Sequence, residues 1–365
     1  RISRSTDNMA YTTIDDPSAH FQTALYTGNA SDGLAITFDG NSDLQPDWVW
    51  IKPRSFSGFG VVTDTNRGLT KNIYPNSTDA EETNTARIQS MNSDGFTINN
   101  DSDTINKDSQ NFAAWCWKAN GGTTSSNGNG NITSTVQANT TAGFSIVTYT
   151  GNGTAGQTVG HGLSSQPDMI IVKKRAGGDA YGWGVWHTSL SNNNGTKQLI
   201  LNTTSAEVTQ DMFNDAIFPS GSATVFATGE NNYTNYPSGA TYVAYCFNSV
   251  QGYSKFGTLT GNADADGPFV YLGFKPAWIM YKVNSTTDDW MIFDSKRIHS
   301  ATQHDYLEPN TTDAEGFLAV TFLSNGFKIT EASGAKFNAD GATYIYMAFA
   351  ESPFVSSKGV PTTAR

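Results

Sequence analysis

The clearest spacing for metal chemistry lies in residues 262–267, where Asn262, Asp264 and Asp266 alternate with alanines before a glycine. Side-chain oxygens at alternate positions followed by glycine are typical of the start of a calcium-binding loop. The glutamate that completes such a loop at its twelfth position is missing, because Gly273 stands there. The ligand count therefore favours an ordinary hairpin tip over a calcium site, and no other cofactor is predicted.

Residues for hydrolytic or nucleophilic catalysis are not grouped in the sequence. The five histidines are not paired at metal-ligand spacing, and there is no nucleophile elbow or phosphate-binding loop. A glycosidase needs two carboxylates in one cleft, and the Glu-x-Asp-x-x-Glu pattern of some glucanases is missing. Asp64 and Asp294 end equivalent predicted strands, but His187 stands at the third position, which favours turn capping. The sequence therefore predicts a protein without enzymatic activity.

Four aromatic residues stand in segments typical of recognition loops. Tyr181 and Trp183 follow a Gly/Asp loop, and Tyr233 and Tyr236 lie in an Asn-rich segment. Sugar rings stack on exposed aromatic side chains, and tyrosines among Asn and Gly are common on binding surfaces. These four residues are the candidate glycan-binding residues, with local packing of long loops as the alternative interpretation.

These candidates belong to a sequence that repeats three times. Four motifs recur in the same order: a Pro-led motif at 46–52, 167–173 and 276–282, a Gly-Asn motif at 26–29, 149–152 and 259–262, an Asn-to-Glu motif at 76–81, 202–207 and 310–315, and an aromatic motif at 112–117, 242–247 and 346–351. Solenoid units run about 20–50 residues, so repeats of this length are whole domains.

The motifs divide the chain into six parts: an arm at 1–20, a first repeat at 21–118, a Gly/Asn/Ser/Thr linker at 119–142, a second repeat at 143–250, a third repeat at 251–351 and a tail at 352–365. The second and third repeats are joined almost directly, which implies a fixed relative orientation. Within the arm, Asp16 and Pro17 predict a short capped turn.

The apolar residues alternate or form short runs, which is the pattern of strands. Each repeat has an opening strand, a Pro-led strand, a third strand and a final aromatic strand. Hairpins are predicted at Asp94-Gly95 and Asn325-Gly326, with Ser220-Gly221 as a less regular counterpart. The prediction is an all-β fold of three tandem antiparallel β-sandwich domains.

The final strand has one small and one large face. Phe112, Ala114 and Cys116 share the first, whereas Trp115 and Trp117 share the second. The large face needs cover from long loops or a neighbouring domain. Cys116 and Cys246 occupy equivalent positions, with Ala350 assigned to the third repeat, so both thiols are predicted to be buried and unbonded.

Charge and hydropathy exclude several partners. The net charge is −11 and no run of Lys or Arg occurs, so nucleic acid is not an expected partner. No stretch approaches the roughly 18 apolar residues of a membrane span, so membrane insertion is not expected. Residues 1–9 lack the hydrophobic segment of a secretory signal.

The repeat text resembles a known module. The motifs that carry the resemblance are Gly273–Trp278, Phe293–Arg297, Leu323–Phe327, Tyr344–Glu351 and the ending Phe354–Pro361. They are similar to a concanavalin-A-like or jelly-roll module of virion proteins of tailed bacteriophages, especially marine and cyanobacterial ones. The second repeat departs most, with Ser222-Ala223 where Gly-Phe is expected. The resemblance implies a virion surface role and supplies no catalytic residues.

The expected function is therefore that of a bacteriophage virion structural protein, of the tail-fibre, tail-associated or capsid-decorating type, located on the particle surface or tail. Host attachment through surface glycans is its expected activity. A virion-associated polysaccharide depolymerase and a cellular extracellular adhesin are the alternatives. The expected partners are other virion proteins, host-surface carbohydrate and further copies of the chain. A homo-oligomer, with a trimer as the leading form, would cover the Pro-led strand, which is apolar on both faces.

Overall fold

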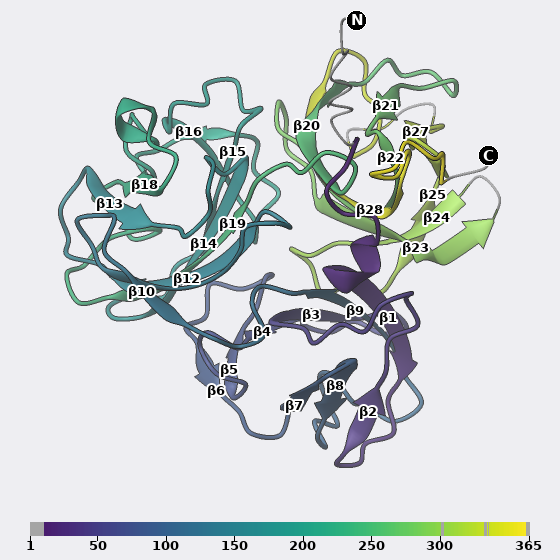
Figure 1. Cartoon of the computed structure of the whole chain (residues 1–365), viewed down its shortest axis with the longest axis horizontal. Helices are drawn as coiled ribbons and strands as arrows, with labels where there is room; N and C mark the ends of the chain where they lie inside the picture. Colours follow the sequence, from purple (N-terminus) through teal and green to yellow (C-terminus); the bar gives the residue numbers. More distant parts are fainter. Residues whose placement is uncertain (1–10, 301–302, 332–333, 335, 363–365) are drawn as a thin grey trace, which may run out of the picture.

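Antiparallel β-sheets make up nearly all the regular structure of the computed structural model, which describes residues 11–300, 303–331, 334 and 336–362 (Figure 1). Two 3₁₀ segments, η1 (Pro17–Ala19) and η2 (Pro219–Gly221), are the only helical elements in these residues. The Asp16 side chain accepts a hydrogen bond from the Ser18 amide, which confirms the predicted capped turn. In the described part of the chain, no helix is long and apolar enough to span a membrane.

The first repeat contains a six-stranded and a three-stranded sheet. The larger has the order β1-β9-β3-β4-β5-β6, formed by β1 (Phe21–Thr27), β9 (Asn111–Trp117), β3 (Trp48–Pro53), β4 (Val61–Asp64), β5 (Lys71–Ile73) and β6 (Glu82–Thr83). The smaller has the order β2-β8-β7, formed by β2 (Leu34–Ile36), β8 (Gly95–Ile98) and β7 (Ile88–Asn92). Val49 and Ile51 of the larger sheet share an apolar cluster with Phe96 and Ile98 of the smaller. The two sheets are therefore layered face to face.

The third repeat has the same plan. Its larger sheet has the order β20-β28-β22-β23-β24-β25, formed by β20 (Ser254–Thr260), β28 (Thr343–Pro353), β22 (Phe274–Val283), β23 (Trp290–Ser300), β24 (Gln303–Leu307) and β25 (Gly316–Leu318). Its smaller sheet has the order β21-β27-β26, formed by β21 (Phe269–Tyr271), β27 (Gly326–Ile329) and β26 (Val320–Leu323). Ile279 and Tyr281 of the larger sheet share a cluster with Phe327 and Ile329 of the smaller.

The second repeat extends the plan at one edge. Its larger sheet has the order β10-β11-β12-β19-β14-β15-β16-β17, formed by β10 (Ser125–Asn127), β11 (Ser134–Asn139), β12 (Phe144–Thr150), β19 (Thr241–Phe247), β14 (Met169–Ala176), β15 (Trp183–His187), β16 (Lys197–Ile200) and β17 (Val208–Thr209). The smaller sheet pairs β13 (Gln157–Gly160) with β18 (Val225–Thr228). Ser220-Gly221 lies in η2, not between paired strands, so the second repeat lacks the distal hairpin of the other two.

The prediction that residues 119–142 form a linker is wrong. This segment supplies β10 and β11, and β11 pairs along its whole length with β12. Strand β10 lies at the sheet edge, and β11 buries polar side chains such as Ser134 and Gln137, so the Gly/Asn/Ser/Thr composition concealed both strands. The second repeat therefore begins inside the segment interpreted as a linker.

The three larger sheets share one strand order: opening strand, final strand, Pro-led strand, third strand. Register corrects one predicted alignment. Trp48 pairs with Trp117, Met169 with Phe247 and Trp278 with Phe349. The third-repeat equivalent of Cys116 is therefore Ala348 instead of Ala350. A shift of two residues keeps every side chain on its predicted face, so the interpretation of a small buried position is unaffected.

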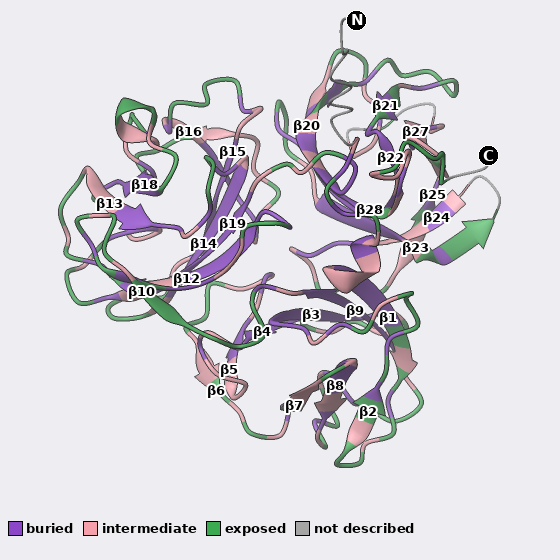
Figure 2. Cartoon of the chain, in the orientation of Figure 1, coloured by how far each residue is buried: buried purple, intermediate pink, exposed green. Residues whose placement is uncertain are grey.

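The large faces of the three final strands meet at a common centre (Figures 1 and 2). Trp48 stacks on Tyr245 with ring centroids 4.7 Å apart, and Trp117 meets the edge of Trp278 at 5.3 Å. Phe349 closes the circle by contacting Phe247 at 6.1 Å. The cover that the large faces require thus comes from neighbouring repeats of the same chain.

The described parts of the arm and the tail pack within the chain. Thr12 and Ile14 are buried, and the Tyr11 hydroxyl donates to the carbonyl of Gly273 in the third repeat at 2.8 Å. Asp15 accepts a hydrogen bond from the Ser357 amide of the tail at 2.6 Å. Residues 1–10 and 363–365, also assigned to arm and tail, lie outside the described residues.

Cys116 and Cys246 are buried and unbonded, as predicted. Burial raises the pKa of both thiols. We expect a thiol reagent at neutral pH to label the native protein at least about 100-fold more slowly than the chain in denaturant, because the reactive thiolate is scarce and inaccessible. Time-resolved labelling followed by mass spectrometry measures this ratio. Rapid native labelling of both residues would contradict their placement.

Candidate functional site

The residues that recur at the ends of the third strands hold the repeats together. Asp64 binds Arg67 of its own repeat at 2.6 Å and accepts a hydrogen bond from the Tyr245 hydroxyl of the second repeat at 2.7 Å. Asp294 binds Arg297 at 2.7 Å and accepts from the Trp115 indole of the first repeat at 2.9 Å. All these side chains are buried. The predicted turn-capping role is confirmed, since both aspartates also accept local backbone amides.

The third such position uses neutral chemistry. His187 accepts from the Ser189 amide through Nδ1 and donates through Nε2 to the carbonyl of Tyr346 in the third repeat. Burial lowers the pKa of His187 to about 4, so the ring is neutral at pH 7. The residue equivalent to Tyr245 and Trp115 is here Met347, which has no donor for a carboxylate, and Leu190 replaces the arginine. The carboxylate, its arginine and its aromatic donor are therefore absent together.

A second recurring contact joins each Pro-led strand to the next repeat. Glu81 is paired with Arg175 at 2.7 Å, and Glu315 with Arg54 at 2.8 Å. We call each interface between two repeats a seam. In the seam between the second and third repeats, Glu207 accepts a hydrogen bond from the side-chain amide of Asn284. In all three seams the glutamate amide also donates to the carbonyl of its partner at 2.9 Å. The first repeat contacts the third, the third contacts the second and the second contacts the first, which closes a ring.

Three equivalent lysines are buried in these seams. Lys52 donates to the carbonyl of Thr311, Lys173 to that of Thr78 and Lys282 to that of Thr204, each in the next repeat. Burial lowers the pKa of Lys173 to about 7 and the pKa values of Lys52 and Lys282 to about 8. Each ammonium is therefore unfavourable in the folded state relative to the unfolded chain.

Lys173 makes stability depend on pH. The pKa of an unfolded lysine is about 10.4, so between pH 7 and pH 8.5 the unfolded chain holds more protons than the folded one and stability rises with pH. Above about pH 8.5 the thiols of the unfolded chain ionise and oppose this rise. We expect the unfolding free energy of wild type minus that of Lys173→Met to increase by roughly 1–2 kcal/mol from pH 6.5 to 8.5. Urea titrations at several pH values test this, and a pH-independent difference would contradict it.

The structure separates the four predicted glycan-binding residues. Tyr181 and Tyr233 are half-buried and meet edge to face with ring centroids 4.9 Å apart, although they come from two distant loops. Tyr236 is 45% exposed beside them in sequence. Lys174 donates to the side chain of Asn232 in the same region. The three tyrosines thus belong to neighbouring loops of the second repeat.

The prediction that Trp183 binds glycans is wrong. Its side chain is buried, and its indole donates to the carbonyl of Tyr74 in the first repeat at 2.8 Å. Trp290 makes the corresponding bond from the third repeat to the carbonyl of Ile200. Trp183 therefore belongs to a seam and cannot offer its ring to a sugar. The signal for this role was the position of Trp183 at the start of strand β15, which the preceding Gly/Asp loop obscured.

The candidate calcium loop uses its oxygens internally. The Asn262 side chain accepts from the Asp264 amide, and the Asp264 side chain accepts from the Asp266 amide at 2.8 Å. Asp266 forms an ion pair with Lys328. The buried Asn338 donates to Asn262 and to the carbonyl of Asp264. Across the described residues, no three His, Cys, Asp or Glu side chains are grouped to hold a metal ion.

The Gly-Asn turn before this loop is held in the same way in every repeat. The amides of Asn29, Asn152 and Asn262 donate to the side chains of three buried asparagines, Asn106, Asn235 and Asn338. The recurrence of the turn is therefore explained by a structural clamp. The hairpin-tip interpretation is wrong, because the strands that flank the turn, such as β20 and β21, lie in different sheets.

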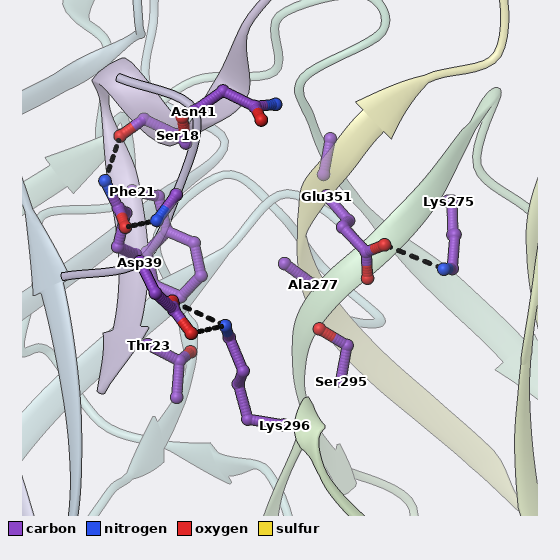
Figure 3. A pocket seen from close by; sticks show the side chains of 13 residues that line it. Ser18, Phe21, Thr23, Asp39, Asn41, Lys275, Ala277, Ser295, Lys296 and Glu351 are labelled. Carbon is purple, nitrogen blue, oxygen red and sulfur yellow. Dashed lines mark hydrogen bonds and ion pairs between the residues drawn. The ribbon is translucent and has the colours of Figure 1, made fainter. Parts of the chain in front are cut away.

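A polar cleft of about 400 Å³ lies between the first and third repeats (Figure 3). Lys296 pairs with Asp39 at 2.6 Å across the cleft, and Lys275 pairs with Glu351 at 2.7 Å beside it. Phe21, Ala277 and Ala350 contribute apolar lining. Sequence reasoning missed this site, because its residues come from distant segments of two repeats. The four charged side chains and the small apolar lining can accommodate a hydroxyl-rich ligand.

A second cleft of about 400 Å³ lies within the second repeat, where Asp168, Asp215 and Trp186 contribute to its lining. Asp168 accepts from the Ser249 amide at 2.6 Å, and the buried Trp186 packs edge to face on Phe218. These contacts stabilise the surrounding loops. The cleft between the repeats is the more open to new interactions, because its ion pairs are partly exposed.

The sequence profile of one family, described as a domain of unknown function (DUF7483), matches residues 16–353. The chain therefore belongs to this family. The match spans all three repeats, so the complete ring is the unit that the family profile describes. No curated protein and no solved structure was found to be similar to the chain.

Proposed function

We propose that the chain is a structural protein of a bacteriophage virion, of the tail-fibre, tail-associated or capsid-decorating type, that contacts host-surface glycans. The observation that carries the proposal is the use of the recurring charged residues. The Asp–Arg and Arg–Glu pairs lie at the seams between repeats, where they hold the repeats together. The repeated residues therefore build a scaffold. A rigid scaffold whose loops carry Tyr, Asn and Ser suits attachment better than catalysis.

The finer fold assignment is part of this proposal. We infer that each repeat is a small sandwich of the concanavalin-A-like or jelly-roll type. The clusters that join a larger sheet to a smaller one in the first and third repeats support this assignment. Resemblance in sequence to virion modules supports the location on a phage particle, and an antibody against the chain that labels tailed particles would test it.

A homo-oligomer, with a trimer as the leading form, stays a prediction. The apolar Pro-led strand does not require an oligomer, because other repeats of the chain cover Trp48 and Trp50. Avidity on a particle provides a separate reason, since linked copies strengthen a weak glycan contact. Other virion proteins are the remaining proposed partners.

A polysaccharide depolymerase is the second candidate, favoured by the carboxylates of Asp39 and Glu351 in one cleft. Each carboxylate is held by a lysine, an arrangement that leaves neither as a free acid or base. We therefore place binding ahead of hydrolysis. Release of reducing ends from host polysaccharide that stops in Glu351→Gln would reverse this order. The third alternative, an extracellular adhesin, would require a secretion signal in the full gene product.

The tyrosine loops of the second repeat provide a direct test. We expect the double variant Tyr233→Ala/Tyr236→Ala to weaken binding to a responsive glycan roughly tenfold, which is about 1.4 kcal/mol, because stacking surface is lost. Glycan-array screening followed by calorimetry measures the change. Phe59→Ala, which removes an equally exposed aromatic side chain from the first repeat, is the control. If wild type binds no glycan on the array, the attachment proposal is wrong.

A further inference from the structure

The cleft between the first and third repeats has two counterparts in the same molecule, because the seams are equivalent. Asp64 pairs with Trp48 and Asp294 pairs with Trp278, so Asn66 and Lys296 occupy matching positions two residues later. Each cleft residue of the third repeat can therefore be compared with the equivalent residues of the other two repeats.

In the seam between the first and second repeats, the matching space is filled. Strand β11 lies there along β12, and Asn66 donates to the carbonyls of Thr135 and Ile146 at 3.1 Å. Thr65 donates to the side chain of Gln137 on the same strand. At this seam the side chains of Thr65 and Asn66 are hydrogen-bonded by the chain itself.

The floor of the open cleft differs from the equivalent places in the other two repeats by a single residue. Asp47 accepts the amides of Ala119 and Gly121 at 2.8 Å, and Asp168 accepts that of Ser249, so each carboxylate holds the turn after a final strand. The third repeat has Ala277 at this position. Strand β28 continues to Pro353 and pairs with β22 through an irregularity at Ala277, so no turn follows it there that requires a carboxylate. Ala277 therefore leaves space that an aspartate would fill.

The charges around this cleft are missing at the equivalent positions of the other two repeats. Lys275 replaces the glutamines at 45 and 166, and Lys296 replaces Asn66 and Ser189. Glu351 stands where the other repeats have Ala119 and Ser249. Surface ion pairs contribute little to stability, about 0–1 kcal/mol, so holding the repeats together does not account for three new charges around one cavity.

We infer that this cleft binds an acidic saccharide, a sugar unit bearing a carboxylate or sulfate group; the inference rests on the proposed glycan contact. Acidic groups of the saccharide bind the ammonium groups of Lys275 and Lys296. Sugar hydroxyls donate to Asp39 and Glu351, which lose their lysine partners in the exchange. A simple anion would leave those carboxylates unpaired, whereas an acidic sugar satisfies both signs. Asn41 and the hydroxyl groups of Ser18 and Ser295 complete the polar lining.

The size of the cleft agrees with this ligand. A volume of about 400 Å³ lies in the range of small-molecule sites, roughly 300–1,000 Å³. The partly exposed Ala277 suits the C–H face of a sugar ring, whereas Phe21 and Ala350 are buried beneath the cleft. Figure 3 shows Ala277 between the two ion pairs.

Calorimetric titration of the full chain tests the inference, with trigalacturonic acid as the acidic probe, maltotriose as the neutral one and inorganic phosphate as a competitor. Wild type is expected to bind trigalacturonic acid at least tenfold more tightly than maltotriose. Lys296→Asn, which imports the residue of the first repeat, is expected to weaken this binding about tenfold. Ala277→Asp, which imports the carboxylate of the other repeats, is expected to weaken it at least tenfold. Lys71→Asn, a lysine distant from the cleft, should change it less than twofold.

Several outcomes would overturn the inference. These are no heat with trigalacturonic acid, equal binding of maltotriose, displacement by an equal concentration of phosphate, or wild-type affinity in both cleft variants. Because both substitutions import residues that the fold already accepts at equivalent positions, a folded variant is expected, and circular dichroism checks it. Failure here with persistent array binding that depends on Tyr233 and Tyr236 would reject the cleft and retain the glycan contact.

Discussion

The packing of large aromatic side chains between repeats is the interaction on which the rest of the structure depends. In the first and third repeats, alternate residues of the final strand face the smaller sheet, and the others, including Trp117 and Phe349, face the centre of the molecule. Trp48, Trp117 and Trp278 are almost completely buried there, but each needs the other repeats for its burial. Removing such a side chain from a packed core costs about 3–5 kcal/mol. A single repeat would expose this whole face to water.

This constraint explains where the charged residues are. The ring has three heterologous seams, in which each repeat offers one surface to the next and a different surface to the previous one. Buried pairs such as Asp64 with Arg67 and Asp294 with Arg297 add directional contacts to an otherwise non-directional aromatic core. Buried ion pairs are not a general source of stability, and here they fix how the repeats are oriented. The seam that lost them keeps its register through His187 and the backbone of Tyr346.

The same arrangement leaves one seam available for ligands. Where β11 fills part of the seam between the first and second repeats, Thr65 and Asn66 are hydrogen-bonded to that strand. Where no strand fills the seam between the first and third, the lining carries Lys275, Lys296, Asp39 and Glu351. Duplication of a scaffold thus provides three similar interfaces, of which one can change its chemistry without loss of the core.

Much of the fold could be predicted from the sequence, since alternating residues in a strand such as β9 assign each side chain to a face. The large face of Trp115 and Trp117 correctly predicted cover by a neighbouring domain. Strands β10 and β11 could not be predicted, because both are held by backbone hydrogen bonds and their side chains, including the buried Ser134 and Gln137, are mostly polar. The burial of Trp183 and the meeting of Asp39 with Lys296 depend on how repeats pack, which local patterns do not report. Tyr181 and Tyr233 were correctly placed in loops, but their contact was not predictable.

The central claim is that the three repeats unfold as one unit. Native-state hydrogen exchange in low denaturant, read by mass spectrometry, measures the opening free energies of β9, β19 and β28. The account predicts that these three strands share one opening free energy. It also predicts that Tyr245→Phe, a change in the seam between the first and second repeats, lowers the value for β28 as much as for β9 and β19. Separate opening free energies, or a change confined to the first and second repeats, would contradict the account.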